Sequence, residues 1–109
     1  PKADATPDAE EAEFQRLVPE AEVRVAHEEL AMAMDSREPW AKTIVPLQER
    51  NVAAALQAYE AGGEAYLVVL EATRRLVEAR LRELELGLDV RRARARLDRA
   101  VGWRIHASR

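Results

Sequence analysis

The chain lacks cysteine and has few aromatic residues, and each shortage excludes a class of protein. Without cysteine it can form no disulfide framework, thiolate metal site or cysteine nucleophile. Aromatic residues make up 5% of the chain and charged residues 34%, which argues against one round apolar core. No run approaches about eighteen consecutive apolar residues, so no helix is predicted to span a membrane.

Alanine, leucine, glutamate and arginine dominate the chain, and all four are good helix formers. This bias is typical of long helices and coiled coils, which bury apolar area along seams. Residues 1–60 carry 6 basic and 13 acidic side chains, whereas residues 61–109 carry 11 basic and 7 acidic ones. Because halves of opposite charge attract when they fold back on each other, the asymmetry favours a hairpin.

Adjacent glycines at Gly62 and Gly63 divide the chain into two helical arms. Glycine readily adopts the positive φ that ends a helix and reverses the chain. The apolar residues on both sides recur at three- and four-residue spacing, which indicates helices. We therefore predict an all-α fold, a long antiparallel, coiled-coil-like helical hairpin with arms at about 9–61 and 64–103 and its tip at 62–63.

The hairpin domain is predicted to cover residues 9–104. Residues 1–8 are small and acidic and include two prolines, so they are predicted to be a disordered lead-in. Residues 105–109 are predicted to be a short tail.

Two of the three prolines in the first arm, Pro39 and Pro46, lie close together in its middle. Pro39 disfavours a helical conformation of Glu38, the residue before it. Pro46 lies too deep in a helix starting near Trp40 to be its first residue, so it should bend that helix. The first arm is therefore predicted to be kinked or broken near Pro39 and Pro46.

The segment before the glycines carries two apolar stripes at helical spacing. One stripe consists of Ile44, Leu47, Asn51, Ala54, Ala58 and Ala61, and the other of Val45, Val52, Leu56 and Tyr59. A helix in a simple two-helix hairpin needs one apolar face, so two stripes indicate two helical partners.

The residues around the turn resemble the tip of a TolC-like outer-membrane efflux channel. In that family a Tyr is followed three residues later by a Gly, and then by an aliphatic stretch that ends in Leu, an acid and Ala. The residues that match without a gap are Tyr59, Gly62, Val69, Leu70, Glu71 and Ala72. Ile44-Val45-Pro46 resembles the Pro-containing segment before the tip, and Val101-Gly102 resembles the end of the returning helix.

The resemblance covers roughly residues 20–103 and implies a role in export. Such channels are trimers with a helical tunnel across the periplasm, located in the periplasm and the outer membrane. Their tips contact a periplasmic adaptor (membrane fusion) protein, which connects them to an inner-membrane pump. This chain would be a tunnel-wall hairpin, with an adaptor-docking tip at Gly62, Gly63, Glu64, Ala65 and Tyr66.

A second hypothesis is a stand-alone soluble helical module that self-associates as a bundle and exports nothing. Tyr66 could equally be a packing residue that contacts Tyr59. The five arginines between Arg91 and Arg99 point in several directions on a helix, which favours a solvated or ion-paired surface over nucleic-acid binding.

No enzyme, cofactor or metal site is predicted. The serines and the two histidines make no credible triad. Met32 and Met34 diverge on a helix, and His27 has no second histidine nearby, so no metal-ligand set is predicted.

Overall fold

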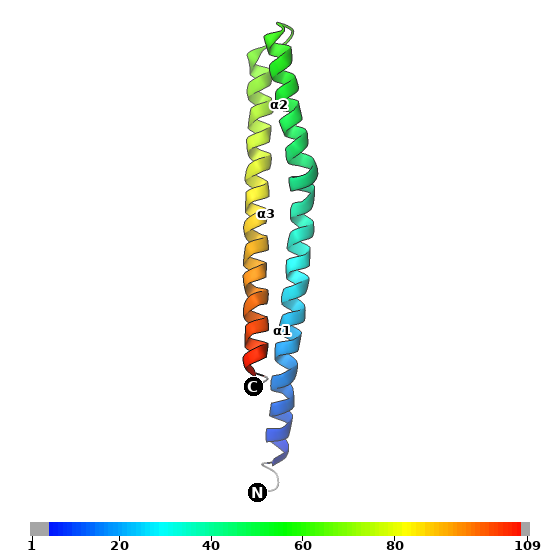
Figure 1. The fold of residues 1–109 in the computed structure, drawn as a ribbon, viewed down its shortest axis with the longest axis vertical. Coiled ribbons are helices and arrows are strands. Elements are labelled where there is room, and N and C mark those ends of the chain that lie inside the picture. The colour runs from blue at the N-terminus through cyan, green and yellow to red at the C-terminus, as the bar shows by residue number, and fades with distance from the viewer. Residues whose placement is uncertain (1–4, 108–109) are drawn as a thin grey trace. The chain divides into compact units, whose positions relative to one another are not determined.

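A computed structural model describes the backbone of residues 5–107 and the side chains of residues 20–103, 105 and 106. Its elements are the helices α1 (Ala5–Pro39), η1 (Trp40–Ile44), α2 (Val45–Glu60) and α3 (Tyr66–Ala107), and no strand occurs among the described residues (Figure 1). The predicted all-α fold is confirmed. The chain divides into two compact units, residues 33–90 and residues 1–32 with 91–109, which are described separately.

The helical arms are longer than the sequence indicated. Helix α1 begins at Ala5 rather than near residue 9, because a proline such as Pro7 is tolerated in the first turn, where N–H groups have no helical partner. Helix α3 continues to Ala107, past the expected end near residue 103. Residues 1–4 of the predicted lead-in and residues 108–109 of the predicted tail lie outside the described part.

The unit of residues 33–90 is a helical hairpin. Helix α2 and the first part of α3 run side by side and are joined by the turn after Glu60 (Figure 1). Val45, Leu76 and Ala79 form a buried cluster, against which Trp40, Ile44 and Val52 pack. The covered residues of α3 alternate three and four apart, as in a coiled coil: Val69, Ala72, Leu76, Ala79, Glu83, Leu86 and Val90.

The first arm is not broken at its prolines. Pro39 has helical dihedral angles, with φ −59° and ψ −36°, and Glu38 before it is also helical, so the expected extended conformation of Glu38 is wrong. Between the prolines the helix widens into the π-helical segment η1. The N–H of Val45 donates to the carbonyl of Trp40, five residues back rather than four.

Only part of each predicted stripe of α2 contacts the rest of the hairpin. Val45 is buried and Val52 half-buried, as are Gln48 and Ala55 between and after them. From the other stripe, Leu47, Asn51, Ala54 and Ala61 are exposed. The residues that pack against α3 therefore lie mainly on the stripe that begins at Val45.

A second apolar stripe runs along α3 on the side away from its buried residues. We call Leu67, Leu70, Val77, Leu81, Leu84 and Leu88 the outward stripe. Each is at least 48% exposed, and Leu84 reaches 67%. The spacing of three, four or seven residues places them on one helix face, nearly opposite the buried one. Helix α3 therefore has two apolar faces, of which the hairpin covers one.

The other unit pairs residues of α1 with the C-terminal part of α3. Its buried residues are small: Ala26 is 7% exposed and Ala93 only 1%, so the two helices approach closely. Val23, Leu30, Leu97 and Ala100 are half-buried around them. Arg96 forms an ion pair with Glu29, with its Nε 3.6 Å from the Glu29 Oε2.

Candidate docking tip

The turn between α2 and α3 is built by backbone hydrogen bonds and one glycine. Gly62 has φ +81°, a region that L-residues with a side chain rarely adopt, and no other described residue has positive φ. The N–H groups of Gly62 and Gly63 donate to the carbonyls of Tyr59 and Ala58, both at 2.9 Å. These two bonds satisfy carbonyls at the end of α2, as in a Schellman-type cap.

The aromatic rings of Tyr59 and Tyr66 pack against each other at the base of the turn. Their centroids are 5.2 Å apart and the rings are tilted by 56°, a favourable aromatic geometry. The predicted packing of Tyr66 on Tyr59 is therefore confirmed. Because 42% of Tyr59 and 53% of Tyr66 remain exposed, the pair also presents apolar surface to solvent.

The structure brings all five predicted tip residues together at the turn. Gly62, Gly63, Glu64 and Ala65 form the connection itself, and Tyr66 begins α3. All five are exposed. Residues 51–73 contain three glutamates and no lysine or arginine, so the tip is acidic as well as apolar.

The two glycines should differ in their tolerance of a side chain. Gly62→Ala is expected to lower the free energy of unfolding by about 1–2 kcal/mol, since alanine at φ +81° is strained. Gly63 has no positive φ, and a Cβ there would lie 3.7 Å from the Ala58 carbonyl oxygen, an ordinary contact. Gly63→Ala should therefore be nearly neutral. Urea unfolding of both variants measures the difference, and equal losses would contradict this account of the turn.

A polar layer interrupts the apolar seam below the tip, and it was not predicted from the sequence. Arg37 is half-buried, and its Nη2 lies 3.3 Å from the Glu83 Oε1. The Nε of Arg37 also lies 3.5 Å from the place where a Cβ of Gly87 would be. Gly87 therefore lies beside the arginine, at a distance where a methyl group would make an ordinary contact. We call Arg37, Glu83 and Gly87 the Arg37 layer.

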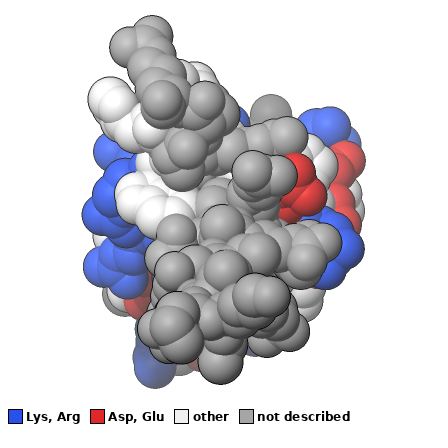
Figure 2. All heavy atoms as spheres, turned by 90° about the horizontal axis from the view of Figure 1, so that it is seen from below, with Lys and Arg blue, Asp and Glu red and all other residues white. Residues whose placement is uncertain are grey.

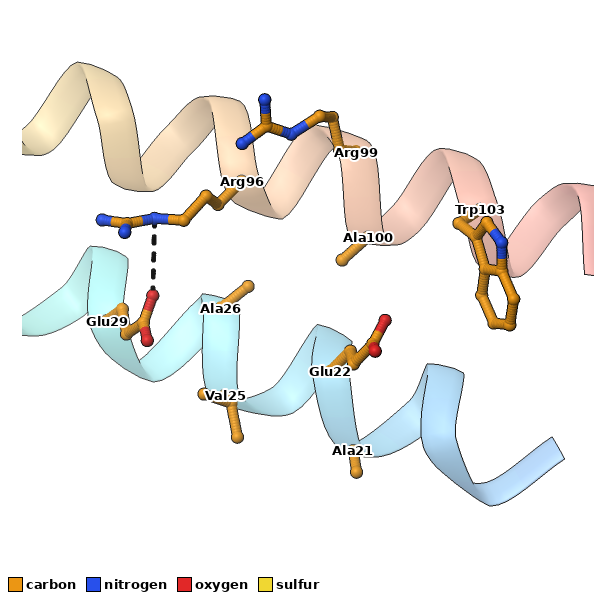
Figure 3. Close-up of a pocket in the computed structure, with 9 residues that line it drawn as sticks. All are labelled: Ala21, Glu22, Val25, Ala26, Glu29, Arg96, Arg99, Ala100 and Trp103. Carbon is orange, nitrogen blue, oxygen red and sulfur yellow. Dashed lines mark ion pairs between the residues drawn. The ribbon is translucent and has the colours of Figure 1, made fainter. Parts of the chain in front are cut away.

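A shallow groove lies in the unit formed by residues 1–32 and 91–109. Its floor is apolar, and its rims carry glutamates on α1 and arginines on α3 (Figure 3). The lining residues are Ala21, Glu22, Val25, Ala26, Glu29, Arg96, Arg99, Ala100 and Trp103. Trp103 projects toward the open end of the groove, where it is 50% exposed (Figure 3).

Among the described residues, the arginines and methionines considered in the sequence analysis do not come together as a binding site. Arg96 pairs with Glu29. Seen from below, basic side chains gather at the left-hand edge of Figure 2, and acidic and basic side chains lie close together at its right-hand edge. Met32 and Met34 are exposed. Within the described residues no group of three or more His, Asp or Glu could hold a metal ion, and no helix there is long and apolar enough to cross a membrane.

Comparison with known protein families gives a match that covers nearly the whole chain. A family model described as outer membrane efflux protein matches residues 3–103. No curated protein and no solved structure matches the chain.

Proposed function

Since the chain belongs to the outer membrane efflux protein family, we propose that it forms a segment of a periplasmic tunnel wall and docks an adaptor protein at its tip. In this proposal the chain works in an efflux channel together with a periplasmic adaptor and an inner-membrane pump. The full channel is a homotrimer located in the periplasm and outer membrane. Its role is mechanical and involves no covalent chemistry.

The docking proposal rests on the geometry of the tip, observed in a chain that belongs to this family. The exposed turn residues and the braced pair of Tyr59 and Tyr66 present a rigid surface with apolar and acidic groups. Aromatic side chains held in one conformation lose little entropy when a partner covers them. Docking would therefore use the turn from Gly62 to Tyr66, and movement of the two arms at the tip would open the passage for substrate.

The two apolar faces of α3 support the tunnel-wall part of the proposal. One face packs within the hairpin, and the outward stripe is left for a neighbouring helix. A helix in a closed tunnel wall contacts helices on both sides, so it needs two apolar faces. A helix in an isolated hairpin needs only one.

Crosslinking in cells tests the docking. The chain has no cysteine of its own, so Gly63→Cys in the full-length channel gives one reactive site at the tip. With a thiol-to-photoreactive crosslinker, this variant should form an adduct with the adaptor. Glu85→Cys, an exposed position on α3 away from the tip, is the control and should form none. Docking is wrong if the Gly63→Cys channel reaches the outer membrane and gives no adaptor adduct.

The outward stripe also favours the second candidate function, a self-associating helical bundle without transport. Exposed apolar surface of this extent drives association in water. The size of the native protein separates the two functions. An immunoblot band several-fold heavier than 12.3 kDa in the outer-membrane fraction supports the channel, and a soluble band near 12.3 kDa supports the module.

A further inference from the structure

The covered residues of the first arm of the hairpin follow two series that differ by one residue. Before and within η1 they are Ala33, Arg37, Trp40 and Ile44, with spacings of four, three and four. From η1 onward the main series is Ala41, Val45, Gln48, Val52 and Ala55, with spacings of four, three, four and three, and Pro46 and Ala58 are half-buried outside it. Each series alone is a regular coiled-coil seam. The seam therefore changes phase by one residue at η1.

The π-helical turn is the backbone feature that makes this change possible. A π-turn holds one residue more than an α-turn, so it moves every later residue by about 100° around the helix axis. Pro46 favours it because proline has no N–H to donate to the carbonyl of Lys42, four residues back. Trp40 belongs to the first series and Ala41 to the second. Both are half-buried, as expected where the first series ends and the second begins.

Without the π-turn, the first series would continue along a different face of α2. Extending the spacing beyond Ile44 leads to Leu47, Asn51, Ala54, Ala58 and Ala61. This is the apolar stripe of α2 whose members Leu47, Asn51, Ala54 and Ala61 are exposed. Helix α2 therefore contains two complete seams, and the chain uses the one that requires the π-turn.

The choice between the seams rests on a few side chains. The seam in use places Val52 against the hairpin, and the alternative would place Asn51 there. A buried asparagine without a partner is unfavourable, whereas a buried valine is favourable. This difference favours the present seam. At the preceding pair of positions the present seam covers Gln48 and the alternative would cover Leu47, which favours the alternative seam, as does its regular backbone.

We propose that η1 is a one-residue register switch that selects which face of α2 packs against α3. When η1 is π-helical, Val45, Val52 and Ala55 face α3. When it becomes α-helical, α2 rotates by about 100° and the seam of Leu47, Asn51 and Ala54 replaces them. The rotation carries Tyr59 away from Tyr66, so the switch also changes the tip.

A two-residue exchange tests the switch. The double variant Asn51→Val with Val52→Asn moves the valine from the seam in use to the alternative seam and keeps the composition unchanged. We expect α2 to rotate in this variant. The hydrogen bond from Val45 N–H to the Trp40 carbonyl, observed by NMR through its scalar coupling, should be replaced by one to Ala41.

Adjacent cysteine substitutions report the same rotation independently. In the parent chain, Ala54→Cys should react with a maleimide several-fold faster than Ala55→Cys, because Ala54 is exposed and Ala55 half-buried. In the exchanged background the order should reverse. The reaction is run at nanomolar protein, so that association does not shield either thiol. The proposal is overturned if, in the exchanged background, Ala54→Cys still reacts faster than Ala55→Cys and the Val45 N–H still donates to the Trp40 carbonyl.

A deletion supplies the matched control. Removing Thr43 takes one residue out of η1, which puts Val45, Val52 and Ala55 in phase with Arg37 and Trp40 through a regular α-helix. The π-type hydrogen bond should disappear while Ala55→Cys stays slow. If Ala55→Cys becomes fast, the phase argument is wrong. The switch belongs to the chain itself, so its failure and the failure of adaptor docking are separate results.

Discussion

Leu76→Ala should lower the free energy of unfolding by about 2–5 kcal/mol, the usual loss for a buried leucine. Leu76 is 9% exposed and packs against Val45 and Ala79 in the buried cluster of the hairpin. The hairpin has few large buried side chains, so neighbouring residues cannot easily fill the space. Because domains are stable by only about 5–15 kcal/mol, this is a large share of the total.

Leu84→Ala provides the control for this prediction. It removes the same atoms from the same helix, but Leu84 is 67% exposed and belongs to the outward stripe. Its effect should stay within about 0.5 kcal/mol, as for most surface substitutions. Urea unfolding followed by circular dichroism, at a concentration where the chain is monomeric, measures both. Equal losses would mean that the two faces of α3 are not distinguished as described.

The double variant Leu81→Glu with Leu84→Glu should abolish self-association of the isolated chain. Both residues lie in the outward stripe, and both are more than half exposed in the single chain. If a second chain covers the stripe, each glutamate must lose its hydration without a partner, which is strongly unfavourable. Light scattering should show the parent above the 12.3 kDa of one chain and the variant at that mass.

A matched pair of charge-removing substitutions separates the outward stripe from general surface charge. Glu78→Gln with Glu85→Gln alters exposed residues of the same helix that lie outside the stripe. This variant should associate like the parent. A parent chain that is strictly monomeric at high concentration would mean that the outward stripe drives no association, and it would weaken the tunnel-wall proposal as well.

Much of the fold could be predicted from the sequence because its signals are local. Helix-forming composition and apolar spacing predicted the helices, and the Gly62-Gly63 pair predicted the reversal that the positive φ of Gly62 confirms. The contact between Tyr59 and Tyr66 followed from their positions on either side of that reversal. The docking role of the tip remains a prediction.

The phase change at η1 could not be predicted, because it is a property of the backbone. Pro39 and Pro46 signalled an irregular helix, but a kink, a break and a π-turn all fit the same residues. The sequence also showed two stripes on α2 without indicating which one packs. That choice depends on a single residue accommodated in the segment from Trp40 to Ile44.

Ion pairs cannot be predicted from helical spacing alone, since long charged side chains have several partners in reach. The acid-first pairs Glu71–Arg75 and Glu78–Arg82 have the favourable helical order. The structure instead pairs Arg74 with Glu78 and Arg82 with Glu85. Pairs between helices, such as Arg80 with Glu49, depend on how the arms align and leave no trace in local spacing.

The Arg37 layer has a consequence for how many alignments of the two arms are possible. The buried positions of α3 repeat every seven residues with similar aliphatic side chains, so a hairpin slipped by one repeat would bury nearly the same apolar area. In the slipped form, however, Arg37 would lie against Leu76 or Val90 instead of Glu83, with which it forms an ion pair. The slipped form would therefore lose this ion pair, so the Arg37 layer favours the observed alignment of the two arms over its slipped neighbours.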